Sequence, residues 1–291
     1  MDDVRPEIDQ DVCTSCGTCV EVCRFEVLKL RRRGAEACGI GRCIVCGACV
    51  AVCPTGALSH PAMPADRLRD LPAEPAVGYQ DLMALLGQRR SIRRYTDEPV
   101  PEADLRRLVE AAILAPSGHN AQPWAFTFVT DPARLDEIRA AYAEFYRGLL
   151  AQAADESGRE ELAAAHGERA LRLLDAMSGA LQLIVRAHDR GDDRLMWRAP
   201  VLAMVHSTAD APVAEVSCTY AAANMMLAAT ALGLGTCIVG FLNVPMLIDP
   251  GFMSVLELPK GHVLRGGMAV GHPARRYLRS VVRRDPPVTI V

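Results

Sequence analysis

Residues 13–23 have the sequence CTSCGTCVEVC, and residues 43–53 have the sequence CIVCGACVAVC. The two stretches agree at seven of eleven positions and begin thirty residues apart, so they form an internal repeat that builds one small domain from two half-units. Each has the spacing C-x2-C-x2-C-x3-C, which places four thiolates on a tight loop that runs into a helical turn. This arrangement is typical of sites that hold a cubane iron–sulfur cluster.

Zinc and disulfides are the alternative interpretations of the cysteines. Zinc ribbons use paired C-x2-C knuckles without a third and a fourth cysteine in the same run, which disfavours zinc. The N-terminal MDDVRPE has neither a basic n-region nor an apolar h-region, so we expect a reducing, cytoplasmic location in which disulfides are rare. Cys38, Cys218 and Cys237 lie outside the repeats, and the default expectation for each is a small buried hydrophobic residue.

The repeat resembles the bacterial two-cluster ferredoxins over residues 9 to 60. In that family the fourth ligand of each cluster comes from the other cysteine run. The resemblance therefore implies two [4Fe–4S] clusters, the first bound by Cys13, Cys16, Cys19 and Cys53 and the second by Cys43, Cys46, Cys49 and Cys23. Gly17 and Gly47 would leave backbone N–H groups free to approach cluster sulfur. Arg24 stands where the family has a proline and would put a cation near one cluster.

The chain has 291 residues, of which 50% are hydrophobic. This length leaves room for a cluster domain of about 60 residues and a second domain of about 200 residues with its own core. The sequence predicts the cluster domain over residues 1–60 and the larger domain over residues 79–291. Four prolines between them are incompatible with regular helix or a central strand, so residues 61–78 are the predicted linker.

Charge patterning excludes some classes of function. A net charge of −3 gives no electrostatic case for binding nucleic acid. Residues 216–248 carry no charge, but Asn, Gly and Pro interrupt them, which favours a buried helix over a membrane span. Lys29 and Arg31–Arg33 form one basic run between the cysteine repeats. It is either a solvated hairpin tip or a docking patch for an acidic electron-transfer protein.

The larger domain alternates helices and strands without a regular βαβ rhythm, so the predicted fold class is α+β. Apolar spacing predicts helices and strands at many positions. The expected helices are 81–90, 101–114 and 213–232, the expected strands are 125–130, 200–206 and 268–271, and residues 91–100 are expected to be extended. Residues 147–193 are polar, Ala-rich and helical, and we expect an inserted flap or lid rather than core.

Two further stretches suggest where a redox cofactor could bind. Gly233, Gly235 and Gly240 nearly form a dinucleotide fingerprint, but Ile238 occupies the third glycine position, so no Rossmann nucleotide site is expected. Residues 89–95, RRSIRRY, place four arginines and a serine at a helix-to-strand transition. Such a cluster can bind a phosphate and a second anionic group, although an isolated arginine run is more often a solvated face.

Three motifs in order, RRSxRxY, APSxxNxQPW at residues 115–124 and GLGTCxxG at residues 233–240, resemble the FMN-dependent nitroreductases. The resemblance extends from about residue 79 to the end, and it is to the members that carry an N-terminal two-cluster ferredoxin domain. It implies an α+β fold with a central, mostly antiparallel sheet flanked by helices. It also implies an intertwined homodimer with FMN at the interface, lined by both subunits.

The resemblance also implies residues that bind the flavin. One subunit would supply Arg89, Arg90, Ser91 and Arg93, with Arg93 beside the flavin N1/O2 edge, and the other would supply Pro116, Ser117, Gly118 and Asn120. Backbone near the isoalloxazine ring would come from Gly235, Thr236, Cys237 and Gly240, and phosphate contacts from Arg279 and Arg283. His272 replaces the tyrosine of the family's Gly-Tyr-Pro segment.

The implied activity is ping-pong reduction of a small organic acceptor, a nitroaromatic, quinone or activated alkene, with two clusters exchanging electrons with FMN. NADH or NADPH, or a ferredoxin or flavodoxin, are the candidate donors. The alternative is an electron-transfer module that relays electrons between a ferredoxin-like donor and a protein partner. No side chain is a required acid or base, although His119 is either a proton donor to the substrate or a satisfied loop histidine.

Overall fold

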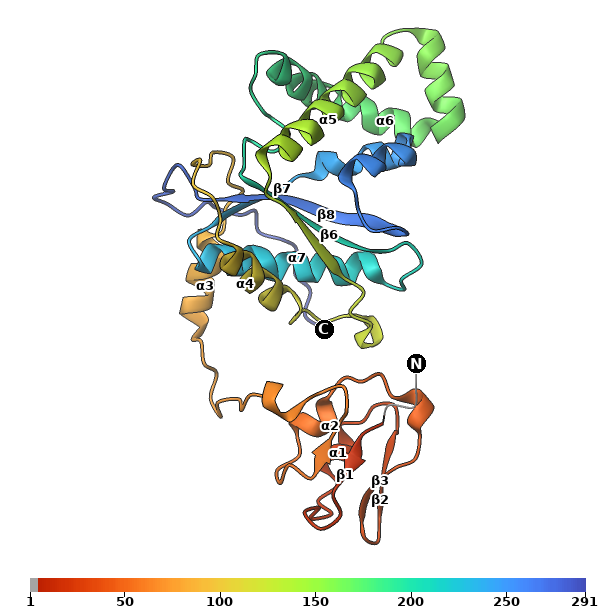
Figure 1. Cartoon of the computed structure of the whole chain (residues 1–291), viewed down its shortest axis with the longest axis vertical. Coiled ribbons are helices and arrows are strands. Elements are labelled where there is room, and N and C mark those ends of the chain that lie inside the picture. The colour runs from red at the N-terminus through yellow and green to blue at the C-terminus, as the bar shows by residue number, and fades with distance from the viewer. Residues whose placement is uncertain (1–4) are drawn as a thin grey trace. The chain divides into compact units, whose positions relative to one another are not determined.

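The computed structural model describes residues 5–291, which divide into two compact units (Figure 1). The first extends to Ala76 and includes His119–Ala121, and the second contains the remaining residues from Val77 to Val291. The predicted linker over residues 61–78 stays a prediction.

The first unit is built from short elements around the two cysteine runs. Its helices are α1 (Thr18–Glu21) and α2 (Ala48–Ala51), and its strands are β1 (Glu7–Ile8), β2 (Leu28–Arg31), β3 (Gly34–Ala37) and β4 (Leu58–Ser59). β1 pairs with β4 and β2 pairs with β3, both antiparallel. Short 3₁₀ turns follow at Ile40–Arg42 and Ala65–Arg67.

Each cysteine run turns into its helix at a glycine. Gly17 and Gly47 precede α1 and α2 with φ angles of 80° and 76°, a left-handed conformation that glycine adopts without steric cost. The core cluster of the first unit is small and consists of Cys19, Leu28, Ala35 and Leu58. A few further residues of the unit are buried outside this cluster, among them Val27, Val50, Ala57 and His60. A core this small leaves the unit marginal by apolar burial alone.

The second unit contains a four-stranded antiparallel sheet in the order β5-β6-β8-β7. The strands are β5 (Ala125–Val129), β6 (Val201–Thr208), β7 (Gly235–Ile238) and β8 (His262–Gly271). β6 is buried along all but its last residue, because helices cover both faces of the sheet (Figure 1). The mixed helices and antiparallel strands confirm the predicted α+β class.

Two groups of helices enclose this sheet. They are α3 (Tyr79–Gln88), α4 (Glu102–Ala112) and α7 (Ala214–Ala231) on one side, and α5 (Pro132–Gln152), α6 (Glu156–Asp189) and the short α8 (Pro245–Ile248) on the other. 3₁₀ segments occur at Gly118–Asn120, Gly240–Asn243 and Pro250–Leu256. α7 buries Cys218, Ala221 and Met225, as expected for a helix that carries no charge from Val216 onward. Among residues 5–291, no helix combines the length and apolar character needed to cross a membrane.

The segment expected to be a flap differs from the prediction in one respect. It is helical, but Leu162, Leu174 and Leu181 of α6 are buried in the larger core cluster together with residues of α5 and β6. The sequence of this segment resembles that of a surface helix because α6 is long and amphipathic. Its polar residues outnumber the leucines that pack into the core. The segment therefore contributes to the core, and a role as a flap stays a prediction.

Candidate functional site

The eight repeat cysteines form two groups. Cys13, Cys16, Cys19 and Cys53 line one small cavity of the first unit. Burial raises the pKa of the Cys19 thiol, and the charges of Cys53, Cys13 and Cys16 raise it further. Such mutual repulsion among thiolates is what a positively charged iron centre would relieve.

The second group lines a cavity of about 180 Å³ and consists of Cys23, Cys43, Cys46 and Cys49. Burial raises the pKa of Cys49 to about 11, and the charges of Cys23 and Cys46 act in the same direction. The backbone N–H of Val27 donates to the Cys23 sulfur at 3.3 Å, as a thiolate ligand requires. Among residues 5–291, no three His, Cys, Asp or Glu side chains are arranged to hold a single metal ion.

Each group combines three cysteines of one repeat with the last cysteine of the other. The residues present therefore fit two cubane clusters, because each cavity is bordered by four sulfur atoms and by a glycine that exposes backbone N–H groups. The assignment of individual ligands stays a prediction.

In the second unit, the arginine motif lies beside the glycine motif. α3 ends at Gln88, and the chain then runs along the edge strand β7, where Ser91 pairs with Thr236 in a parallel bridge. The Ile92 N–H donates to the Thr236 carbonyl at 2.9 Å. The Tyr95 hydroxyl donates to the Ile92 carbonyl at 2.7 Å and fixes the turn. Two segments about 140 residues apart in sequence thus form one edge of the sheet.

Gly235 is required by this close approach. A Cβ atom at Gly235 would lie 2.8 Å from the Cβ of Ile92, which is closer than real side chains come. The sequence predicts no strand here, whereas residues 235–238 form strand β7, which pairs with β8. Strand pairing explains the difference, because a four-residue edge strand has too short a pattern to be recognised from sequence.

A cavity of about 740 Å³ opens next to this edge. Among the predicted flavin residues it is lined by Arg90, Gly235 and Arg279, and Arg275 and Arg276 add two further cations. The Arg90 Nε and the Thr236 hydroxyl are buried without a hydrogen-bond partner among the described residues. Buried polar atoms without partners carry a free-energy cost that a bound ligand can remove. The residues fit an anionic, phosphate-bearing ligand such as FMN.

Cys237 lies on β7 beside the same arginine motif. Burial raises the pKa of its thiol, while Arg93 and Ser91 oppose that shift through charge and hydrogen bonding. The Arg93 guanidinium lies over the Trp197 ring, 5.3 Å from the ring centroid, in a cation–π geometry. Arg93 is therefore held between a buried thiol and an aromatic ring.

Comparison with known proteins places this geometry in a family. A profile described as "Nitroreductase family" matches residues 86–272, which is more than half of the chain. The chain belongs to the nitroreductase family. A second profile, described as "4Fe-4S dicluster domain", matches residues 12–58 of this nitroreductase-family chain. Both matches agree with the two resemblances seen in the sequence motifs.

Individual relatives cover different parts of this nitroreductase-family chain. It is 54% identical to an NADH dehydrogenase of Thermus thermophilus over 54 residues, 19% of this chain and 26% of that protein. It is 29% identical to the 5,6-dimethylbenzimidazole synthase of Rhodospirillum rubrum over 67% of this chain and 83% of that protein. The chain spans only 23% to 36% of the length of the first three curated relatives.

A solved structure supports the fold. The nitroreductase with bound FMN from Bacteroides fragilis is 26% identical, with a TM-score of 0.53 over 72% of this chain and 98% of that one. A structural match at this level confirms the nitroreductase fold of the second unit.

The other predicted flavin residues of this nitroreductase-family chain are not among those that line the 740 Å³ cavity. Pro116, Ser117 and Gly118 follow α4, where the Gln122 N–H donates to the Ser117 hydroxyl at 3.0 Å. His119 and Asn120 belong to the first compact unit. Arg89 begins the arginine motif and is half-buried, Gly240 is exposed after β7, and Arg283 is in the exposed C-terminal segment.

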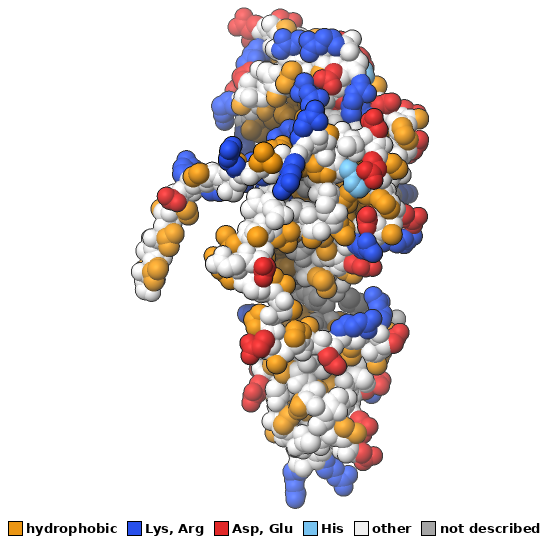
Figure 2. Space-filling model, turned by 90° about the vertical axis from the view of Figure 1, so that its left-hand side faces the viewer, with side chains coloured by type: hydrophobic (Ala, Val, Ile, Leu, Met, Phe, Trp, Pro, Cys, Tyr) orange, Lys and Arg blue, Asp and Glu red, His pale blue; other side chains and the backbone are white. Residues whose placement is uncertain are grey.

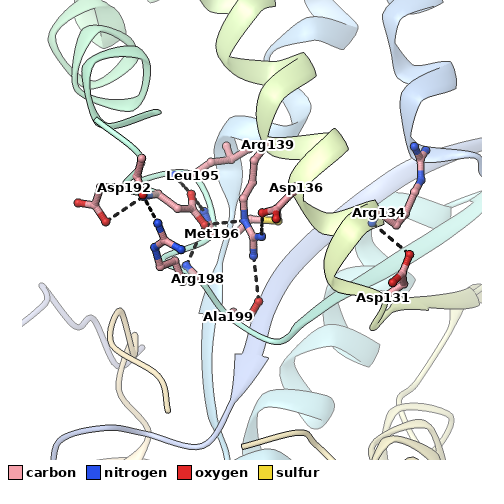
Figure 3. Close-up of polar contacts among 11 residues, drawn as sticks. Asp131, Arg134, Asp136, Arg139, Asp192, Leu195, Met196, Arg198 and Ala199 are labelled. Carbon is pink, nitrogen blue, oxygen red and sulfur yellow. Dashed lines mark hydrogen bonds and ion pairs between the residues drawn. The ribbon is translucent and has the colours of Figure 1, made fainter. Parts of the chain in front are cut away.

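Sequence reasoning missed the loop that supports Arg93. The buried Asp193 carboxylate accepts N–H groups of Leu195, Met196 and Arg198 at 2.8 to 2.9 Å and pairs with the Arg139 Nε at 2.9 Å. Figure 3 shows Arg139 directed at this loop, where it also donates to the Ala199 carbonyl at 3.1 Å. The loop places Trp197 beneath Arg93 with a φ angle of 56°. Asp193 accepts hydrogen bonds from the backbone of its own loop, and no sequence motif identifies a carboxylate with this role.

His60 was also missed. It is buried, and burial lowers its pKa, so the ring is neutral near pH 7. The Ala62 N–H donates to Nδ1 at 3.2 Å, which leaves the proton on Nε2. Nε2 lies 4.0 Å from the Cys43 sulfur and donates toward it. A histidine seven residues after a cysteine run has no recognised spacing, so only the structure reveals this contact.

Proposed function

We propose that this chain is an FMN-dependent oxidoreductase that reduces a small organic acceptor, a nitroaromatic, quinone or activated alkene, and that two [4Fe–4S] clusters exchange electrons with the flavin. The observation that carries the proposal is the arginine-lined cavity beside Gly235, where the buried Nε of the lining residue Arg90 lacks a hydrogen-bond partner among the described residues. Family membership and the FMN held by the Bacteroides relative support it.

The chain's own residues would have distinct tasks at this site. Arg90 and Arg279 line the cavity and would bind the phosphate as charge-assisted donors. Arg93 would place a fixed cation beside the N1/O2 edge, where negative charge develops on reduction. The small Gly235 allows backbone to approach the ring. When bound, FMN would supply the exchange between one-electron and two-electron transfer.

The eight cysteines would hold the two clusters. Because each fourth ligand comes from the opposite repeat, cluster binding would tie the two half-units together and add to the small apolar core. Electrons would reach the acceptor two at a time from NADH or NADPH, or singly through the clusters from a ferredoxin or flavodoxin. The name of the Thermus relative, NADH dehydrogenase, favours a nicotinamide.

We further propose that the working form is a homodimer. Large apolar side chains of the second unit are exposed, among them Leu114, Val216 and Tyr220, at 81%, 55% and 50%. Exposed apolar surface of this kind marks an association surface. A second copy would bring Pro116, Ser117 and Gly118 to the flavin from outside. Light scattering on the purified protein tests this, and a monomer that retains flavin contradicts it.

An anaerobic reductive titration followed by visible absorbance tests the proposed function. NADH or NADPH is added first to freshly purified protein, and then a low-potential reductant, with iron, sulfide and FMN contents measured on the same sample. Bleaching of the flavin band by nicotinamide, followed by turnover of a nitroaromatic or quinone, is the expected result. A preparation without a flavin band overturns the assignment of the second unit.

The same titration separates the relay alternative. If the flavin is present and a protein carrier exchanges electrons with it, while no small oxidant is turned over, the chain is an electron-transfer module rather than a reductase.

A further inference from the structure

The β2–β3 hairpin carries an unusual concentration of positive charge. Lys29, Arg31, Arg32 and Arg33 are all exposed, and Arg31 pairs with Gly34, so Arg32 and Arg33 form the turn. These five residues, Lys29–Arg33, hold four cations and no anion, in a chain whose net charge is −3. Figure 2 shows Lys and Arg side chains at one end of the first unit. We call Lys29–Arg33 the basic hairpin.

Little of this charge is neutralised within the molecule. Arg31 lies 3.7 Å from Glu36, with both side chains 56% exposed, and this is the ion pair that the basic hairpin forms within residues 5–291. Exposed pairs of this kind contribute little to stability. A positive patch left open in this way attracts an oppositely charged surface and accelerates its encounter.

The β2–β3 hairpin, which carries the basic hairpin, approaches the first cysteine group at Gly34, directly after the basic turn. A Cβ atom at Gly34 would lie 3.1 Å from the Cys13 sulfur, and the Gln10 amide donates to the Ala35 carbonyl at 2.8 Å. Leu30 lies on the other strand of the hairpin, β2, and its Cδ2 would be 3.7 Å from a Cβ atom placed on Gly17. Because adjacent Cα atoms are about 3.8 Å apart, the Arg32–Arg33 turn is within a few residues' length of the first group.

The second cysteine group has different surroundings. Gly47 corresponds to Gly17 in the repeat, but Met63 covers it: its Cβ would lie 2.6 Å from the Met63 sulfur. Apolar side chains, including Phe25 and Ile44, and the buried His60 line its cavity, with Arg24 as its one lining cation among the described residues. The cavity of the first group has no lining cation among the described residues, so the difference in charge between the two groups comes from the exposed basic hairpin and not from the cavity linings.

We propose that the basic hairpin is the docking surface for a small acidic one-electron carrier protein, and that electrons pass between this carrier and the first cysteine group. The inference rests on the proposed function, because it requires a cluster at that group. In each transfer the reduced carrier loses one electron and the oxidised cluster gains it, with no bond formed and no proton moved. Two such transfers supply one two-electron reduction of the acceptor.

Charge reversal on the full chain tests the docking surface. The test variant is Arg32→Glu with Arg33→Glu, and the matched control is Arg67→Glu with Arg69→Glu, which makes the same change in net charge on another exposed segment of the first unit. Both are compared with the unaltered protein in anaerobic stopped-flow mixing with a reduced acidic ferredoxin. The measured quantity is the second-order rate constant at low and high salt.

We expect the test variant to lose about tenfold or more of the rate constant at low salt, with the difference shrinking at high salt as charges are screened. The control should change by less than about twofold. Equal losses in both variants, or a rate that does not depend on salt, overturn the proposal. Docking of the carrier at the flavin unit would instead leave the rate constant of the test variant unchanged.

A parallel measurement separates this inference from the proposed function. Iron and FMN contents and turnover with dithionite as reductant are measured on all three proteins, because dithionite needs no protein docking surface. Unchanged turnover with dithionite and unchanged rates with ferredoxin in the test variant refute the docking surface alone. Absence of flavin or clusters in the unaltered protein refutes the proposed function instead.

Discussion

Replacing Asp193 by asparagine should strongly destabilise the second unit. The Asp193 carboxylate is 8% exposed, accepts three backbone N–H groups and pairs with Arg139, whose side chain is 14% exposed. The asparagine amide can keep one accepting oxygen, but its NH₂ group would face donors on Arg139 and on the Arg198 backbone. The variant therefore removes the buried counter-charge of the Arg139 guanidinium, which keeps only the exposed Asp136 carboxylate at 2.6 Å.

The expected magnitude follows from that loss. Removing one partner of a buried ion pair costs about 3–5 kcal/mol, because the remaining charge stays desolvated. With a urea dependence of about 2 kcal/mol per molar, the unfolding midpoint should fall by roughly 1.5–2.5 M. This change is large against a total stability of about 5–15 kcal/mol.

Tryptophan fluorescence provides a selective assay. The chain has two tryptophans, Trp124 and Trp197, and both belong to the second unit, so the signal reports that unit alone. Urea unfolding is measured on flavin-free protein. The matched control is Asp175→Asn, because Asp175 pairs with Arg159 at the surface at 2.9 Å and should give no resolvable shift. A midpoint for the Asp193 variant equal to that of the control would refute the reasoning.

Three further predictions concern the sites. Arg93→Ala should lower FMN occupancy without lowering iron content, whereas Arg94→Ala should change neither; full occupancy in the first variant rules out the assigned role. His60→Leu should make the potential of one cluster more negative, because the donor to Cys43 is lost; redox titration followed by electron paramagnetic resonance measures it, and an unchanged potential contradicts it. Burial, and then the charge of His262, lower the pKa of His206 to about 4 from its usual 6.5. Between these values the unfolded state binds more protons, so stability should fall as pH drops from about 6.5 to about 4, and His206→Gln should flatten this dependence in urea unfolding; an unchanged slope contradicts it.

The cysteine repeat and the three motifs were enough to predict the family and the α+β class from sequence. Local spacing carries this information, because cluster ligands and glycine approaches occur at fixed offsets. Strand β8 was expected only over residues 268–271, but it extends back to His262. The pairing of β6 with residues 262–267 creates that extension, and Gly266 and Gly267 give no strand signal of their own.

Contacts between distant segments could not be predicted. Asp193 caps its own loop and meets Arg139 only because α5 crosses that loop, and the sequence separates the two by 54 residues. The same holds for His60 and Cys43, which depend on the turn through Ala62. Capping by a loop carboxylate and donation to a thiolate are specified by tertiary geometry, for which a single sequence contains no periodic signal.

The unequal surroundings of the two cysteine groups suggest why the repeat has diverged outside its ligands. The first group lies under a hairpin of exposed cations, and the second lies among apolar side chains and a neutral histidine that donates to Cys43. Nearby exposed charge favours exchange with a soluble partner, whereas a fixed donor tunes a potential. Two clusters with the same ligand spacing can therefore hold different positions in one electron path. The residues around the cysteines, rather than the cysteines themselves, would determine the order in which the two clusters are reduced.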